Sequence, residues 1–288
     1  MAKKQRKRKT IGDGNMNKVK YLIDGFASFI RTLFERRYLI AEMAKRDIAV
    51  QHAGSMLGFF WTFANPLVMI FILWLVFSVG FKAAPKGDVP FVIWLTAGMA
   101  MWNTFSEIIN GSTGVIINNS HLVKKVVFPL SILPVVKLVG SLITHAVFLI
   151  MLFALILLYR MPVSLYWFQA LYYFAAMAML ALGISWITSS VNIFARDTSQ
   201  IVNVILQFGF WGTPVFWDPG IMPPKVQLLL KLNPMFYIVQ GYRESFIYFV
   251  PFWSHPAMTL YFWGVTGVIF VLGATIFLRL RPHFADVL

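Results

Sequence analysis

The chain has 288 residues, of which 59% are hydrophobic and 12% charged, and its mean hydropathy is +0.71. A soluble core cannot hide so much apolar surface, so the composition excludes an ordinary water-soluble domain and indicates an integral membrane protein. The chain has no cysteine, which excludes disulfides, thiolate metal sites and a cysteine nucleophile. The net charge of +14 comes largely from the N-terminal part. No folded basic domain accompanies it, so anionic lipid and the positive-inside rule explain it better than nucleic acid does.

The N-terminal segment prepares the entry into the membrane. Residues 1–32 are predicted to be a basic cytoplasmic tail, and residues 33–55 an amphipathic helix on the inner membrane surface. Between Asp47 and Lys82 there is no Asp, Glu, Lys or Arg. This run exceeds the roughly 20 residues that a helix needs to cross a hydrocarbon core of about 30 Å. The basic start is similar to a signal peptide, but an apolar run of full length indicates a retained span.

Residues 56–288 are predicted to form an all-α membrane domain with six transmembrane helices. The expected spans are Leu57–Gly80, Pro90–Ile117, Leu133–Tyr159, Tyr166–Phe194, Gln200–Phe216 and Met258–Leu278. Lysine and arginine favour the segments on the N-terminal side of the membrane, which predicts that both termini are cytoplasmic.

Two connections between these spans are unusual. The inner one, residues 118–134, mixes apolar side chains with Lys124 and Lys125, which suits a short helix at the inner interface. The outer one, residues 217–252, is apolar but repeatedly broken by proline and glycine. Each unbroken piece is too short to cross a bilayer, so we expect short re-entrant helices in the outer leaflet, before the last span.

Charged residues near the membrane leave alternatives open. Glu107 is the only acidic residue placed within a span, where a central charge costs about 2.5–3.5 kcal/mol. It either lines a path or pairs with Lys137, or it lies near the inner end of its helix and reaches headgroup water. The pairs Arg46-Asp47 and Arg196-Asp197 either fix the surface helix against the loop before the fifth span or are independent solvated charges.

Aromatic residues crowd the first and fifth predicted spans. Aromatic rings pack against the C–H faces of sugars while leaving the hydroxyls hydrated, so they would suit a non-ionic lining for a polysaccharide. Lipid contact and helix packing are the alternative explanation for each of them. The candidate lining residues are Phe59, Phe60, Trp61, Phe63, Phe210 and Trp211.

Enzyme chemistry has no anchor in this sequence. It contains no G-x-x-x-x-G-K-[ST], H-E-x-x-H or G-x-S-x-G motif, and its five histidines lack the spacing of metal ligands. A single intramembrane acid argues against an ion-coupled carrier. The absence of clustered His, Asp or Glu argues against a membrane glycosyl- or acyltransferase. We therefore expect no catalytic residue, no metal and no nucleotide site in this chain.

Several motifs, in chain order, resemble those of the ABC-2 type permeases that export polysaccharides. The first group is Arg46-Asp47, Gly54-Ser55-x-Leu57-Gly58-x-x-Trp61 and Asn65-Pro66; the second is Leu122–Pro129 with Leu133-Pro134; the third is Arg196-Asp197, Thr213-Pro214-Val215 and Asn233-Pro234 followed by Arg243. The family includes permeases for O-antigen, capsular polysaccharide and teichoic acid. One departure is Gln51-His52, where the family commonly has Arg-Tyr, and it puts a substrate contact at these two positions in doubt.

The resemblance implies a half-transporter of the bacterial cytoplasmic (inner) membrane that works as a homodimer among membrane lipids. A separate ABC ATPase chain would carry the ATP and Mg that this chain has no site for. The first and fifth spans of both copies would line the conduit. The ATPase would dock on the surface helix and the inner loop, at Arg46, Asp47, His121, Leu122, Lys124, Lys125 and Phe128. The broken outer segment would form a gate with Pro214, Asn233, Pro234 and Arg243.

The function expected from this resemblance is export of a lipid-linked polysaccharide across the cytoplasmic membrane. An ABC-2 permease for a drug or small lipid is the alternative. The sequence does not name the glycan, its lipid anchor or a periplasmic partner.

Overall fold

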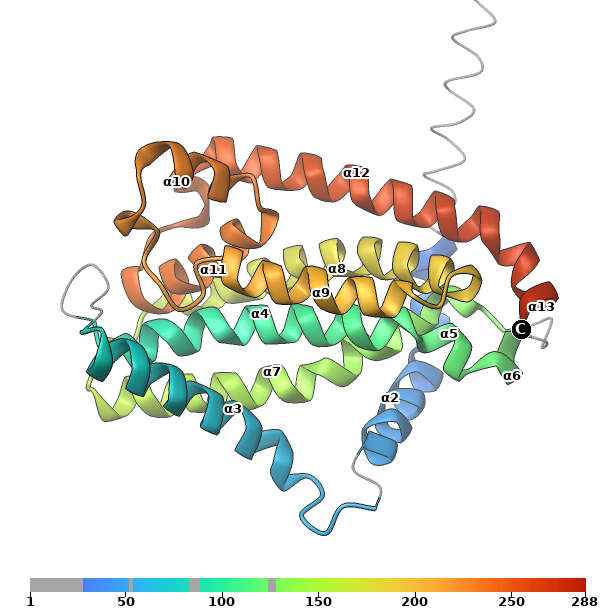
Figure 1. Ribbon diagram of the computed structural model, residues 1–288, viewed down its shortest axis with the longest axis horizontal. Helices are drawn as coiled ribbons and strands as arrows, with labels where there is room; N and C mark the ends of the chain where they lie inside the picture. Colours follow the sequence, from blue (N-terminus) through green and yellow to red (C-terminus); the bar gives the residue numbers. More distant parts are fainter. Residues whose placement is uncertain (1–27, 52–53, 83–88, 124–127) are drawn as a thin grey trace, which may run out of the picture.

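The computed structural model of the protein describes residues 28–51, 54–82, 89–123 and 128–288, and it is an elongated bundle of helices (Figure 1). The described residues form helices and connecting loops without any strand, so the prediction of an all-α fold is confirmed. Four helical segments are long and apolar enough to cross a membrane: Phe60–Gly80, Leu130–Leu158, Leu165–Phe194 and Pro256–Val287. The total of six spans stays a prediction.

The elements follow the apolar runs and break at proline and glycine. In the first half they are α2 (Arg37–Gln51), α3 (Phe60–Trp74) with a π-helical end η1 (Leu75–Gly80), α4 (Phe91–Thr113), α5 (Val115–Asn118), α6 (Ser120–Val123), η2 (Leu130–Ile132) and α7 (Leu133–Leu158). In the second half they are η3 (Leu165–Phe168), α8 (Gln169–Phe194), α9 (Thr198–Gly212), η4 (Pro219–Ile221), α10 (Pro224–Lys231), α11 (Pro234–Arg243), η5 (Glu244–Tyr248), η6 (Phe252–Ser254), α12 (Pro256–Leu280), η7 (Arg281–His283) and α13 (Phe284–Val287).

Helix α4 is the centre of the bundle, and α7, α8, α9 and α11 pack around it. Most of its residues are buried, including the polar Thr96 and Thr104. These two hydroxyls donate to the carbonyls four residues earlier, at 2.7 Å in both cases, so their burial leaves no unpaired donor. Helix α4 is not among the four apolar candidates for a membrane span. The helices packed around it bury these polar side chains.

Helices α3 and α9 lie at the margin of the bundle and bury little. Only Ile70 and Leu73 of α3, and Val202 and Leu206 of α9, are buried. Large apolar side chains on both helices are exposed, such as Phe208 at 77%. An apolar surface of this kind requires lipid or another protein to cover it.

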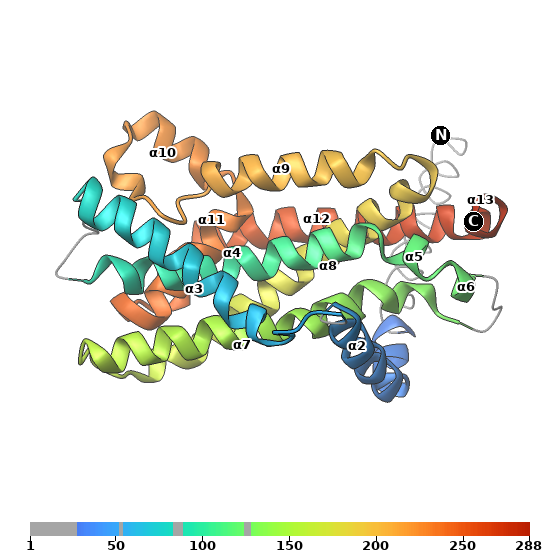
Figure 2. The same cartoon turned by 60° about the horizontal axis from the view of Figure 1, so that its bottom comes forward.

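The two ends of the bundle differ. Figures 1 and 2 place α10 and the start of α4 at one end, and α5, α6 and α13 at the other. This agrees with the expected division between an outer connection at 217–252 and an inner one at 118–134. The outer connection does consist of short helices, but their depth relative to a membrane stays a prediction.

Several predicted boundaries were too long. The predicted second span continued to Ile117, whereas α4 ends at Thr113 and a new short helix follows Gly114. The predicted fifth span ended at Phe216, whereas α9 ends at Gly212 before the Thr213-Pro214 turn. Proline lacks the amide hydrogen that continues a helix, and glycine weakens it, which explains both breaks.

Candidate functional site

A cavity of about 760 Å³ lies between α2, the turn at 54–58 and helices α3, α4 and α7. Each of the three long helices contributes one stripe of side chains at a spacing of four residues, which places them on one helix face. The stripes are Trp61, Asn65 and Met69 on α3; Met99, Asn103 and Glu107 on α4; and Gly140, Thr144 and Phe148 on α7.

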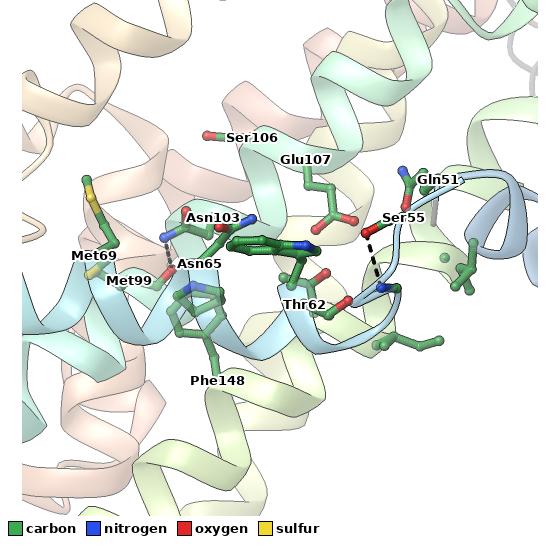
Figure 3. A pocket seen from close by; sticks show the side chains of 17 residues that line it. Gln51, Ser55, Thr62, Asn65, Met69, Met99, Asn103, Ser106, Glu107 and Phe148 are labelled. Carbon is green, nitrogen blue, oxygen red and sulfur yellow. Dashed lines mark hydrogen bonds between the residues drawn. The ribbon is translucent and has the colours of Figure 1, made fainter. Parts of the chain in front are cut away.

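The stripes arrange the cavity in levels, because α4 runs opposite to α3 and α7 (Figure 1). Figure 3 shows Met69 and Met99 at one end, Asn65 beside Asn103 in the middle, and Glu107 near Thr62, Ser55 and Gln51 at the other end. One end is therefore apolar, and the other combines a carboxylate with hydroxyl and amide groups.

The turn at the polar end depends on two glycines. Gly54 and Gly58 have φ values of +79° and +45°, which side-chain-bearing residues rarely adopt. The Ser55 hydroxyl accepts the Gly58 amide N–H at 3.1 Å and closes the turn. These residues of the first sequence motif thus shape the mouth of the cavity.

Several polar groups in the cavity retain hydrogen-bonding capacity. Asn103 donates from Nδ2 to the Met99 carbonyl at 3.0 Å, which leaves its Oδ1 as an acceptor. The side chains of Asn65 and Gln51 make no hydrogen bond to any residue of the described ranges. These groups are available to water or to a ligand.

The ion pair at this site differs from the pairing considered for Glu107. Lys137 Nζ lies 2.6 Å from Asp47 Oδ2, and the two side chains are 16% and 29% exposed. The pair connects α2 to α7. Asp47 therefore fixes the predicted surface helix against the third predicted span, and not against the loop before the fifth predicted span. Glu107 instead lines the cavity. This agrees with the alternative in which Glu107 lines a path, and not with the alternative in which it pairs with Lys137.

A second group of predicted residues meets at the other end of α4. Arg243 is fully buried, and its guanidinium donates to the carbonyls of Pro214 at 2.8 Å and Val215 at 2.7 Å. Its Nε donates to the Trp94 carbonyl at 3.3 Å, and its Cζ lies 3.2 Å from the centre of a Trp94 ring. One side chain therefore joins α4, α11 and the turn after α9.

The remaining residues of this outer cluster fix the same turn. Asn233 accepts the Met235 amide N–H at 3.0 Å as the N-cap of α11, and Pro234 occupies the first turn of that helix. The Asn233 amide also donates to the Thr213 hydroxyl at 2.8 Å. The structure thus brings Pro214, Asn233, Pro234 and Arg243 together. Their role as a gate stays a prediction.

Another ion pair joins this outer segment to the last long helix. His255 Nε2 lies 3.2 Å from Glu244 Oε1, just before α12 begins. Burial raises the pKa of the Glu244 carboxyl, and the neighbouring His255 acts in the opposite direction. The pair lies outside the predicted spans.

A buried polar chain was missed by sequence reasoning. The Thr104 hydroxyl donates to Ala100 O, so it accepts from His145 Nδ1 at 3.0 Å. His145 Nε2 then accepts the Tyr242 hydroxyl at 2.8 Å. The chain connects α4, α7 and α11. The histidine is isolated in the sequence and its partners are 41 and 97 residues away, so no local pattern reveals it.

The aromatic lining candidates form separate groups in one chain. Phe59 and Phe63 contact each other with ring centres 5.5 Å apart, and Phe60 is 58% exposed. Phe210 packs on Phe216 at 5.1 Å, whereas Trp211 is 57% exposed. The start of α3 and the end of α9 lie well apart in both views (Figures 1 and 2). Within a single copy, these aromatic side chains of α3 and α9 therefore do not form a common lining.

The proposed docking residues are only partly described. Lys124 and Lys125 lie outside the described residues, as does His52 of the departure from the family motif. His121 is exposed on α6, and Leu122 is partly buried beside it. Phe128 packs in an apolar cluster with Ile40 and Ala44 of α2. This contact joins the inner loop to the surface helix that also carries Arg46 and Asp47.

The sequence of the chain is similar to those of known transport proteins. The sequence profile of the ABC-2 type transporter family matches residues 38–247. An O-antigen export system permease protein, RfbA, of Klebsiella pneumoniae is 28% identical over 87% of this chain and 95% of its own length. RfbA of Myxococcus xanthus is 27% identical over 89% and 98%. The capsule polysaccharide export inner-membrane protein CtrC of Neisseria meningitidis serogroup A is 22% identical over 76% and 83%.

Proposed function

The chain belongs to the ABC-2 type transporter family, and from this premise we propose that it is the membrane permease of an ABC exporter for a lipid-linked polysaccharide. The observation that carries the proposal is the alignment with O-antigen export permeases over nearly the full length of both chains. The relative from the capsule system supports the same substrate class over a drug or small lipid.

The proposal includes six spans with both termini in the cytoplasm. Helix α4 supports the predicted second span, because 23 residues at about 1.5 Å each extend over about 34 Å. Helix α9, with 15 residues, is about 22 Å long and would cross together with the turn at 213–216. The segregation of the short helices at opposite ends of the bundle supports this topology.

The proposal also includes a homodimer and a separate ATPase chain. Exposed apolar residues recur on α9 at Ile201, Ile205 and Phe208, which is the spacing of one helix face. A second copy would cover such a face and bring its aromatics toward those of α3. The ATPase would bind ATP and Mg, and it would dock on α2 and the inner loop, where Phe128 and the Asp47–Lys137 pair couple these elements to α7.

Deletion of the coding sequence in the source organism tests this proposal. We expect the polysaccharide to disappear from the cell surface and its lipid-linked form to accumulate inside, because assembly would continue without export. A plasmid-borne copy should restore surface display, measured with a lectin or antiserum and by gel analysis of extracted lipid-linked glycan. Unchanged surface polysaccharide in the deletion strain would contradict the proposal.

A further inference from the structure

We propose that the cavity between α3, α4 and α7 is a binding subsite for a neutral, hydroxyl-rich sugar unit. This inference rests on the proposed export of a polysaccharide, and it assigns to one defined site the substrate chemistry that the transporter handles. It differs from a conduit between two copies, because a single chain supplies all of the residues.

The dimensions of the cavity suit a small ligand. Its volume of about 760 Å³ falls within the range of about 300–1,000 Å³ that ligand pockets have. Gly140 contributes to the space, since a Cβ added there would meet nothing within 4 Å. The site therefore has room beside α7 that a larger residue would fill.

The lining offers the contacts that sugars use. The Trp61 indole provides a large aromatic face, and it is 46% exposed. Asn65 and Asn103 add amide groups from the two facing helices, and Glu107 adds a carboxylate (Figure 3). When it is ionised, the Glu107 carboxylate would hold a sugar hydroxyl more tightly than an amide would, because hydrogen bonds to a charged acceptor are stronger than neutral ones.

The charge of the lining selects a neutral ligand. Glu107 is the only charged side chain among the residues that line the cavity in the described part of the chain. The nearby Lys137 ammonium is already paired with Asp47. A phosphate or diphosphate would face a carboxylate without a cation to balance it, which is unfavourable at low dielectric. The geometry therefore points to a sugar unit and not to the diphosphate of a lipid carrier.

Binding of simple glycosides to the purified full-length protein in lipid nanodiscs tests the inference. The probes are methyl α-D-mannopyranoside and methyl β-D-galactopyranoside, with glucose 1-phosphate as the charged comparison. Saturation-transfer NMR should show transfer to the ring protons of at least one neutral glycoside at millimolar concentrations. Glucose 1-phosphate should bind more weakly than the neutral probes.

Matched variants locate the binding. Gly140→Leu should narrow the cavity beside α7 and weaken binding at least fivefold, whereas Gly264→Leu, at a position of α12 that also has nothing within 4 Å, should leave binding unchanged. Trp61→Ala should weaken binding at least fivefold, whereas Trp253→Ala, which removes an exposed tryptophan outside the lining, should not. Glu107→Gln should weaken binding at least threefold, and each variant must elute as wild type in size-exclusion chromatography.

Three results would overturn the inference: no transfer to either neutral glycoside, tighter binding of glucose 1-phosphate, or equal binding by Gly140→Leu and wild type. None of these results changes the expected outcome of the deletion experiment, because loss of surface polysaccharide on deletion does not depend on this cavity. Failure of the subsite and failure of the exporter are therefore distinguishable.

Discussion

Arg243 donates the hydrogen bonds that connect α4, α11 and the turn after α9 at one end of the bundle. It is buried and forms no ion pair with any carboxylate of the described residues, and backbone carbonyls from two separate segments accept its protons. The planar guanidinium can serve several acceptors at once and also lie against an aromatic ring, which a lysine ammonium cannot do. Gly98 faces the same guanidinium, and a Cβ there would lie 2.7 Å from Nη2.

Replacing Arg243 tests this role. Arg243→Met should lower the free energy of unfolding by at least about 2 kcal/mol, because it leaves buried carbonyls without donors. Arg243→Lys should restore only part of the loss. The exposed Arg279→Met serves as the control, and thermal unfolding in detergent, followed by fluorescence, is the measurement. Equal melting temperatures for Arg243→Met and Arg279→Met would show that the network contributes nothing.

At this scale the sequence allowed some residues to be selected but not their contacts. Arg243 and Asn233 were selected through a family motif, yet their partners come from α4 and the turn after α9. Glu107 was placed on a path or near headgroup water, and only the meeting of three helices puts it in a cavity. Such contacts depend on tertiary packing between distant segments, which local sequence patterns do not reveal.

At the scale of elements, two glycines allow the backbones of α8 and α12 to approach closely. A Cβ on Gly273 would lie 2.2 Å from the Gly183 carbonyl oxygen, and one on Gly183 would lie 2.9 Å from Phe270 Cα. Small residues allow helix backbones in membranes to approach closely and gain dispersion contacts. The two glycines therefore set the distance between these helices.

Adding one methyl group to this crossing should force the helices apart. Gly273→Ala should lower stability by about 1–3 kcal/mol, the usual cost of overpacking. Gly264→Ala on the same helix adds the same methyl group where nothing lies within 4 Å, so it should be neutral or slightly stabilising. Melting temperatures of the two variants in the same detergent compare them, and equal values would refute the close-packing account.

Elements were predictable where they consist of long apolar runs. The runs behind α3, α7, α8 and α12 are hydrophobic enough to be found by composition, and the structure has helices there. The ends of α4 and α9 were misplaced, since Gly114 and the Thr213-Pro214 turn break apolar runs without any change in hydropathy. The Asp47–Lys137 contact joins residues 90 positions apart and was not foreseen.

For the whole molecule, the margins of the bundle support the proposal that a second copy and a separate ATPase complete the transporter. Helices α3 and α9 expose apolar side chains, and the sequence contains no P-loop motif. The account therefore places the conduit between two copies and the energy source on another polypeptide. The family and the substrate class were predictable because short motifs recur in order along the chain. The apolar faces of α3 and α9, which we propose as the dimer interface, were not predictable, because exposure depends on tertiary packing and not on a motif.

Transport by purified components tests the central claim most directly. The chain and the P-loop ATPase proposed as its partner would be reconstituted into proteoliposomes with lipid-linked glycan extracted from the deletion strain. The account predicts ATP-dependent movement of the glycan to the lumen, where an added glycosidase cannot reach it, and no ATP hydrolysis by the chain alone. Glycan that stays accessible while the complex hydrolyses ATP, or ATPase activity of the isolated chain, would contradict it.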